Sequence, residues 1–152
     1  MIQLQKNINE LLAFDPYNID RDIKKNKLIN IIKQQIEFHI KNCEKYKTWY
    51  DSNDFIPPSL IEDYQDIPFI ASSTFKNINL VSIRDSKKIQ SSGTTSSNKS
   101  TIFIDKATSQ NQTKSLSKIL SAILKNKRKN YFIIDLEPKI SSLDNIMSAR
   151  QA

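Results

Sequence analysis

The chain has 152 residues, of which 38% are hydrophobic, and it carries a formal net charge of +7. This length fits a single domain with enough apolar side chains for a core, and no uninterrupted apolar run is long enough to cross a bilayer. The N-terminus lacks the basic and apolar regions of a secretory signal, and the single cysteine, Cys43, excludes an internal disulfide. We therefore expect a cytoplasmic protein.

The positive charge is scattered along the chain. Basic residues cluster only at Lys24-Lys25, at Lys87-Lys88 and over residues 125–129. Lys, Asn and Ile are used heavily together, which is typical of nucleotide bias at tolerant positions. A basic nucleic-acid-binding surface would gather its charges on one face, so we expect no nucleic-acid partner.

The first third of the chain is predicted to be helical. Leu4, Ile8, Leu11 and Leu12 recur at helical spacing over residues 3–14, and Asp15-Pro16 ends this helix. A second, longer helix is predicted over residues 20–50, because apolar residues hold one face at three- and four-residue steps. These residues are Leu28, Ile32, Ile36, Ile40, Cys43 and Tyr46.

His39 borders this apolar face, four residues before Cys43. A zinc site needs further ligands beyond such a pair, so the sequence favours a histidine in the core or at its boundary. A catalytic thiol would need a base and a lowered pKa, and the sequence indicates neither for Cys43. We expect no metal site and assign no catalytic residue.

The middle of the chain is predicted to contain extended segments and short turns, because Pro57-Pro58 and Pro68 interrupt residues 52–83. Strands are predicted at residues 87–90 and 101–105, where β-branched and aromatic residues are frequent in the second run.

A further helix is predicted over residues 108–124, with Thr108 as its N-cap. Its buried side is expected to contain Leu116, Ile119, Leu120, Ile123 and Leu124. The apolar run at 131–135 predicts a buried strand, and residues 141–152 are predicted to begin another helix.

The loop between the two central strands contains Gly93, the only glycine of the chain. An average chain of this length has roughly ten glycines, and glycine alone adopts positive φ without steric cost. Hydroxyls, consecutive backbone N–H groups and the ammonium of Lys99 predict a phosphate-binding loop. A flexible Ser/Thr linker is the alternative interpretation. The position of this segment between two predicted strands favours a phosphate-binding loop instead. The hydroxyls belong to Ser91, Ser92, Thr94, Thr95, Ser96 and Ser97.

Residues 93–100 also differ at one position from a Walker A loop, since Asn98 stands where the second glycine belongs. A Walker A loop opens directly into a helix that holds the phosphates. Residues 101–105 instead predict a strand, so a P-loop-like NTP-binding protein is the weaker alternative.

The sequence Ser91-Ser92-Gly93-Thr94-Thr95 followed by Lys99 resembles the phosphate-binding signature of the adenylate-forming (AMP-binding) ligases. It is most similar to that of the LuxE-type acyl-protein synthetases, also called long-chain-fatty-acid–luciferin-component ligases. The resemblance covers roughly residues 65 to 152. One departure is Ser96, which stands where the family signature has a second glycine. The supporting matches are Ile67-Pro68-Phe69-Ile70, Thr74-Phe75-Lys76, Leu80, Ser100, Asp105 to Thr108, Gln112, Ile133-Ile134-Asp135 and Ser148-Ala149-Arg150.

The pattern of elements predicts an α/β (mixed α+β) fold. It has a helical third at residues 1–50, an irregular segment at 51–86, and a nucleotide-loop part at 87–152 with a strand–loop–strand hairpin, a helix and a strand. Family members are longer, so the resemblance implies an amino-terminal portion of a ligase large domain. Further polypeptide would complete the site.

The resemblance also implies a reaction. A long-chain fatty acid is activated with ATP and Mg²⁺ as an acyl-adenylate, and the acyl group passes to a protein thiol before a partner reductase acts. The implied phosphate-binding residues are Ser91, Ser92, Gly93, Thr94, Thr95 and Lys99. The family's acyl-accepting cysteine lies near its C-terminus, so Cys43 does not inherit that role.

A different class of function stays open on the sequence. The chain is alternatively a non-catalytic remnant or interaction module that binds no nucleotide, because Ser96 replaces the second glycine. We also expect the isolated chain to be oligomeric, aggregation-prone or only partly ordered, since an unpaired apolar strand edge is a template for pairing.

Overall fold

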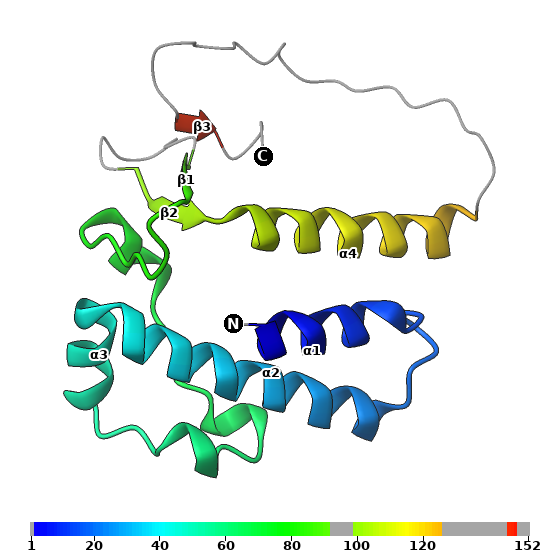
Figure 1. Ribbon diagram of the computed structural model, residues 1–152, viewed down its shortest axis with the longest axis horizontal. Helices are drawn as coiled ribbons and strands as arrows, with labels where there is room; N and C mark the ends of the chain where they lie inside the picture. Colours follow the sequence, from blue (N-terminus) through cyan, green and yellow to red (C-terminus); the bar gives the residue numbers. More distant parts are fainter. Residues whose placement is uncertain (1, 92–98, 126–145, 149–152) are drawn as a thin grey trace.

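The computed structural model describes residues 2–91, 99–125 and 146–148, the last three for their backbone alone (Figure 1). These residues form a mixed α/β structure. Helices α1 (Ile2–Ala13), α2 (Arg21–Asn42) and α3 (Glu44–Asp51) come first. Strands β1 (Lys87–Gln90) and β2 (Thr101–Ile104), helix α4 (Lys106–Leu124) and strand β3 (Ile146–Ser148) follow. The predicted fold class is confirmed.

The turn between α1 and α2 is held by two aspartates. The Asp15 carboxylate accepts hydrogen bonds from the backbone N–H groups of Tyr17 and Asn18, at 2.9 and 3.1 Å. Asp20 caps α2 by accepting from the N–H groups of Asp22 and Ile23 at 2.9 and 3.0 Å. These bonds satisfy donors that the first turn of a helix leaves free. The prediction that the first helix ends at Asp15-Pro16 is confirmed.

The single long helix predicted over residues 20–50 is wrong at its C-terminal end. Cys43 adopts an extended conformation (φ −136°, ψ 101°), ending α2 and starting α3. The break allows aromatic rings of α3 and the following turn to pack together. The Trp49 ring lies 5.4 Å from that of Tyr46 and 5.0 Å from that of Phe55. Tertiary packing therefore outweighs the continuous helical periodicity of the sequence.

The main core lies between α2, α3 and the irregular segment. Ile61, directly after the 3-10 helix η1 (Pro58–Leu60), is fully buried. The Tyr50 hydroxyl donates to the carbonyl of Ile56 at 2.6 Å, so burial of this ring leaves no unpaired hydroxyl. The buried members of the core are Ile29, Ile36, Tyr50 and Ile61, and Ile32, Ile40, Tyr46, Trp49, Phe55 and Ile67 pack against them.

The opposite side of α2 packs against α1 (Figure 1). The Asn7 amide donates to the Gln34 side chain at 3.1 Å, and Lys27 pairs with Glu10 at 3.6 Å. The buried Ile31 lies between positions 27 and 34 on this face. Helix α2 is therefore packed on two sides, whereas its apolar pattern predicts one stripe.

The irregular segment contains three 3-10 helices and no long helix, as its prolines predict. They are η1, η2 (Tyr64–Asp66) and η3 (Ser72–Lys76).

The sheet has the strand order β2-β1-β3. Strand β1 pairs antiparallel with β2, with Lys87 opposite Ile104 and Gln90 opposite Thr101, which confirms the predicted hairpin. Strand β3 pairs parallel with β1 on its other side. The helix predicted within residues 141–152 is thus wrong at 146–148, where pairing with β1 decides the conformation. The strand predicted at 131–135 lies outside the described residues.

Helix α4 begins two residues before its predicted start. Asp105 is its N-cap, and the Asp105 carboxylate accepts from the N–H of Thr108 at 2.8 Å. The prediction of Thr108 as the N-cap is therefore wrong. An aspartate accepts such a bond at least as well as a threonine, and Asp105 directly follows β2.

The predicted buried side of α4 is also wrong in most positions. Leu116, Leu120 and Ile123 are 58%, 44% and 61% exposed. Helix α4 meets α1 through polar contacts instead: Gln5 and Asn111 exchange hydrogen bonds, and the Lys118 ammonium donates to the Ala13 carbonyl at 2.9 Å. In the orientation that these bonds hold, the Leu116, Leu120 and Ile123 side chains of α4 are exposed to solvent. The half-buried positions are Ala107, Asn111, Ser115, Ile119 and Leu124.

Candidate functional site

The hydroxyl-rich loop is anchored at its base by paired hydrogen bonds. The backbone N–H of Ser91 donates to the carbonyl of Ser100 at 3.0 Å, and the N–H of Ser100 donates to Ser91 Oγ at 3.1 Å. One step further along the hairpin, the Gln90 amide donates to Thr101 Oγ1 at 3.3 Å. The antiparallel register of β1 and β2 thus brings both ends of the loop together.

The structure places two of the six predicted phosphate-binding residues. Ser91 is half-buried at the base of the loop, and Lys99 is exposed at its other end. Lys99 forms no ion pair with another described residue. The remaining four, Ser92, Gly93, Thr94 and Thr95, lie outside the described residues.

The described part of the loop has donors that fit a phosphate. The Ser91 oxygen already accepts from Ser100, but a hydroxyl keeps its own hydrogen to donate. The Lys99 ammonium supplies three further donors and a positive charge. A hydroxyl and an ammonium at the two ends of one loop suit an anion with several oxygens, such as the phosphates of ATP.

The element after the loop distinguishes it from a Walker A loop. Strand β2 occupies residues 101–104, and α4 begins only at Lys106. The N-terminal N–H groups of α4 are therefore separated from the loop by the whole of β2. This arrangement lacks the loop-to-helix junction on which a P-loop depends.

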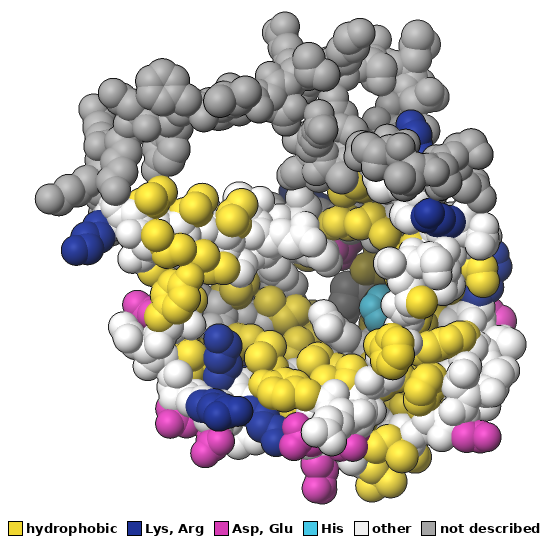
Figure 2. Space-filling model, turned by 180° about the vertical axis from the view of Figure 1, so that it is seen from behind, with side chains coloured by type: hydrophobic (Ala, Val, Ile, Leu, Met, Phe, Trp, Pro, Cys, Tyr) yellow, Lys and Arg dark blue, Asp and Glu magenta, His cyan; other side chains and the backbone are white. Residues whose placement is uncertain are grey.

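A cavity of about 650 Å³ opens between α1, α2 and the start of α4. Figure 2 shows a hollowed face with hydrophobic side chains gathered around it. Residues from distant parts of the sequence line it, so no local pattern predicts it. The described lining residues are Ile2, Leu4, Gln5, Lys6, Ile8, Asn9, Glu10, Gln35, Phe38, His39, Ile83, Asp105, Ala107, Thr108 and Asn111.

His39 lies at the edge of both the core and this cavity. Its Nδ1 is 2.7 Å from the Ser82 hydroxyl oxygen, and its ring centroid lies 5.7 Å from that of Phe38 and 5.6 Å from that of Tyr46. Burial lowers the pKa of His39, which favours the neutral form of the ring. The prediction of a boundary histidine is confirmed. Cys43 is buried, at 6% exposure.

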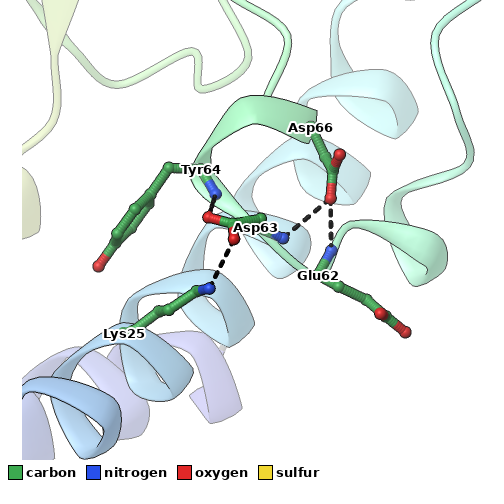
Figure 3. A network of polar contacts seen from close by, with 5 residues as sticks. All are labelled: Lys25, Glu62, Asp63, Tyr64 and Asp66. Carbon is green, nitrogen blue, oxygen red and sulfur yellow. Dashed lines mark hydrogen bonds and ion pairs between the residues drawn. The ribbon is translucent and has the colours of Figure 1, made fainter.

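A polar cluster joins α2 to η2 (Figure 3). The Lys25 ammonium lies 2.8 Å from Asp63 Oδ2, while Asp63 Oδ1 accepts from the N–H of Tyr64. Asp66 accepts from the N–H groups of Glu62 and Asp63 at 3.0 and 2.8 Å.

The hydrogen bonds within this cluster explain the lowered pKa values of its two aspartates. The hydrogen bond from Lys25 lowers the pKa of Asp63, and the bonds from the Glu62 and Asp63 backbones lower that of Asp66. Asp63 is exposed and Asp66 is half-buried, and both side chains already serve as caps of η2. The cluster therefore stabilises the chain locally and has no arrangement for acid–base catalysis.

No group of three or more His, Cys, Asp or Glu side chains within 2–91 and 99–125 is placed to hold a metal ion. Among the helices that the structure describes, none has the length and apolar character needed to span a membrane.

Comparison with known families identifies the class of protein. The family model described as "Acyl-protein synthetase, LuxE" matches residues 2–152. The match covers almost the whole chain, including the residues of the hydroxyl-rich loop. The chain is a member of the LuxE family, which confirms the LuxE-type part of the resemblance and extends it to the N-terminal helices. Searches of curated proteins and of solved structures give no match.

Proposed function

We propose that this protein acts in the ATP-dependent activation of a long-chain fatty acid as an acyl-adenylate, followed by transfer of the acyl group to a protein thiol. The single observation that carries the proposal is the LuxE family match over residues 2–152. The hydroxyl-rich loop, anchored between two antiparallel strands, supports it.

In this proposal, the loop holds the phosphates of ATP. The backbone around Gly93, the hydroxyls of Thr94 and Thr95, and the Lys99 ammonium donate to phosphate oxygens. Ser91 and Ser92 complete the donor set, with Ser91 also anchoring the loop base. Bound ATP supplies the adenylate that activates the carboxylate, and Lys99 offsets the negative charge of the departing pyrophosphate. Mg²⁺ enters with the nucleotide, since it is commonly held by phosphates and only one or two carboxylates.

We also infer that the 152-residue chain is inactive by itself and works with further polypeptide. The exposed apolar side of α4 supports this, with Leu116 58% and Ile123 61% exposed. Additional chain would cover this side, supply groups for adenine and ribose, and present the acyl-accepting thiol. A reductase is the proposed partner that consumes the acyl group, and the cytoplasm is the proposed location.

The test is exchange of pyrophosphate into ATP, driven by a long-chain acid, in the longest product that contains the chain. Replacing Thr94 and Thr95 together by alanine is expected to lower exchange by about 100-fold or more, because two phosphate donors are lost. The matched control replaces Thr48 and Thr113, two exposed helical threonines, by alanine. Exchange that survives the loop substitutions at the control rate would refute the assignment.

The alternative is a non-catalytic interaction module. Ser96 favours it, because serine tolerates positive φ less well than the glycine of the family signature. Calorimetry with ATP and Mg²⁺ separates the two functions. A dissociation constant in the micromolar range, about −8 kcal/mol, excludes the module. Absence of heat at millimolar nucleotide would favour it.

A further inference from the structure

The cavity between α1, α2 and α4 is not part of the loop, and no element of the nucleotide proposal uses it. We propose that it binds the hydrocarbon chain of a long-chain carboxylic acid, with the carboxylate at its Lys6 edge. This inference rests on the proposed function for its choice of ligand and on the cavity for its location.

The size and composition of the cavity suit an aliphatic ligand. Its volume of about 650 Å³ lies within the range of small-molecule sites, which run from roughly 300 to 1,000 Å³. Leu4, Ile8 and Phe38 are only half-buried, so their side chains keep apolar surface that a ligand can cover. Apolar lining comes from four separate parts of the chain: α1 with Ile2, Leu4 and Ile8, α2 with Phe38, the segment before β1 with Ile83, and α4 with Ala107.

Most polar lining groups are already engaged with the protein. The Gln5 and Asn111 side chains bond to each other at 3.1 and 3.3 Å. The Asp105 carboxylate caps α4, and Glu10 pairs with Lys27. These groups already have partners and need no hydrogen bonds from a ligand. A hydrocarbon chain that enters the cavity therefore leaves few polar groups unpaired.

Lys6 provides the charge for the other end of the ligand. It is the only lysine or arginine among the described lining residues, and it is exposed. It forms no ion pair with another described residue. One ammonium beside an apolar cavity is complementary to one carboxylate at the end of a hydrocarbon chain.

The chain connects this cavity to the loop by a short path. Asp105 lines the cavity and directly follows β2, and the loop base lies at the opposite end of the same strand. Four residues of strand span roughly 13 Å. The cavity therefore lies about one strand length from the base of the loop at Ser91 and Ser100.

Direct binding without nucleotide tests the proposal. Tetradecanoic acid and its shorter homologues displace a fluorescent fatty acid from the purified chain, in the absence of ATP. Affinity is expected to rise by about fourfold for each methylene that enters the cavity. Affinity that does not depend on chain length would overturn the proposal.

Two substitutions on α4 locate the site. Ala107→Phe places a ring in the cavity and is expected to lower affinity for tetradecanoic acid at least tenfold. Ala122→Phe makes the same change at an exposed position of the same helix and leaves affinity unchanged. Equal affinities of the two variants would show that the acid binds elsewhere.

Lys6→Gln is a second variant whose fold is not in question, because Lys6 is exposed. It is expected to weaken binding of tetradecanoic acid roughly twofold to fivefold, while binding of 1-tetradecanol stays unchanged. An equal effect on acid and alcohol would refute the placement of the carboxylate.

The failure of this inference is distinguishable from failure of the proposed function. Acid binding with the expected Ala107→Phe loss, but no acid-driven pyrophosphate exchange, supports the cavity and refutes the reaction. Acid-driven exchange whose KM for the acid is the same in Ala107→Phe and Ala122→Phe supports the reaction and refutes the cavity.

Discussion

The N-terminal helical part and the loop-bearing part of this protein differ in how completely they are packed. In the first, Ile29, Ile36, Tyr50 and Ile61 form one buried cluster from three elements. In the second, β1 buries Ile89 and β2 buries Thr101, while α4, which the structure describes in full, contains no buried residue.

This difference indicates that the stability of the fold and the binding of a ligand depend on different parts of the molecule. Residues in a contiguous apolar cluster contribute most of the stability of a small domain, and these residues lie in the helical part. The proposed phosphate donors lie on the hairpin loop, in the part whose described residues include fewer buried side chains. Binding segments are commonly found in such less stable regions, because they must adapt to a ligand.

The largest expected effect breaks the helical part. Ile61→Ala is expected to lower the free energy of unfolding by about 3 kcal/mol, because it leaves a cavity at a fully buried position. Leu60→Ala is the matched control, since Leu60 is the preceding residue and 60% exposed. Its effect is expected to stay within about 0.5 kcal/mol. Urea unfolding followed by circular dichroism measures both, and similar losses would contradict the location of the core.

A smaller effect comes from the pH dependence of the same cluster. Burial, followed by the charge of Tyr50, raises the pKa of Tyr46 from 10.0 to about 12. Because the unfolded chain loses this proton at lower pH, stability present below pH 10 falls as the pH rises toward 12.

The measurement compares the parent protein with Tyr46→Phe. The parent is expected to lose about 1 kcal/mol more than the variant between pH 10 and 12, since solvent screening reduces the effect of a half-exposed group. Urea unfolding at both pH values gives the difference. Burial also raises the pKa of Tyr50. Because Tyr50 titrates in both proteins, its contribution cancels in the comparison. Parallel pH curves would contradict the packing of Tyr46.

The smallest expected effect concerns α4, in the loop-bearing part of the protein. Leu116→Ser together with Leu120→Ser is expected to change stability by less than about 0.5 kcal/mol per site, because both side chains are exposed. The same double variant reduces self-association of the isolated chain, since it removes apolar surface. Unfolding and light scattering give the two readouts. A loss of several kcal/mol would show that α4 is packed as its sequence pattern predicts.

Local chemistry made much of the fold predictable. The β-branched and aromatic residues of the run at 101–105, preceded by the short candidate at 87–90, predicted both strands of the hairpin within one residue. The loop of the candidate site was equally accessible from sequence, because a single glycine among hydroxyls is a local pattern. The cavity was not, because Ile8, Phe38 and Ala107 come together only through packing of three helices.

Short-range sequence patterns were enough to assign most helices and the hairpin strands, the interruption of the middle segment by prolines, and the position of the hydroxyl-rich loop. These features depend on neighbours within one turn or one strand. Tertiary structure alone decided the break at Cys43, the side of α4 that faces α1, and the strand at 146–148. Each of these depends on a partner distant in sequence: the Ile36 core, the polar bonds to Gln5 and Asn111, and the free edge of β1. Such partners exist only after the chain has folded, so short-range patterns carry no record of them.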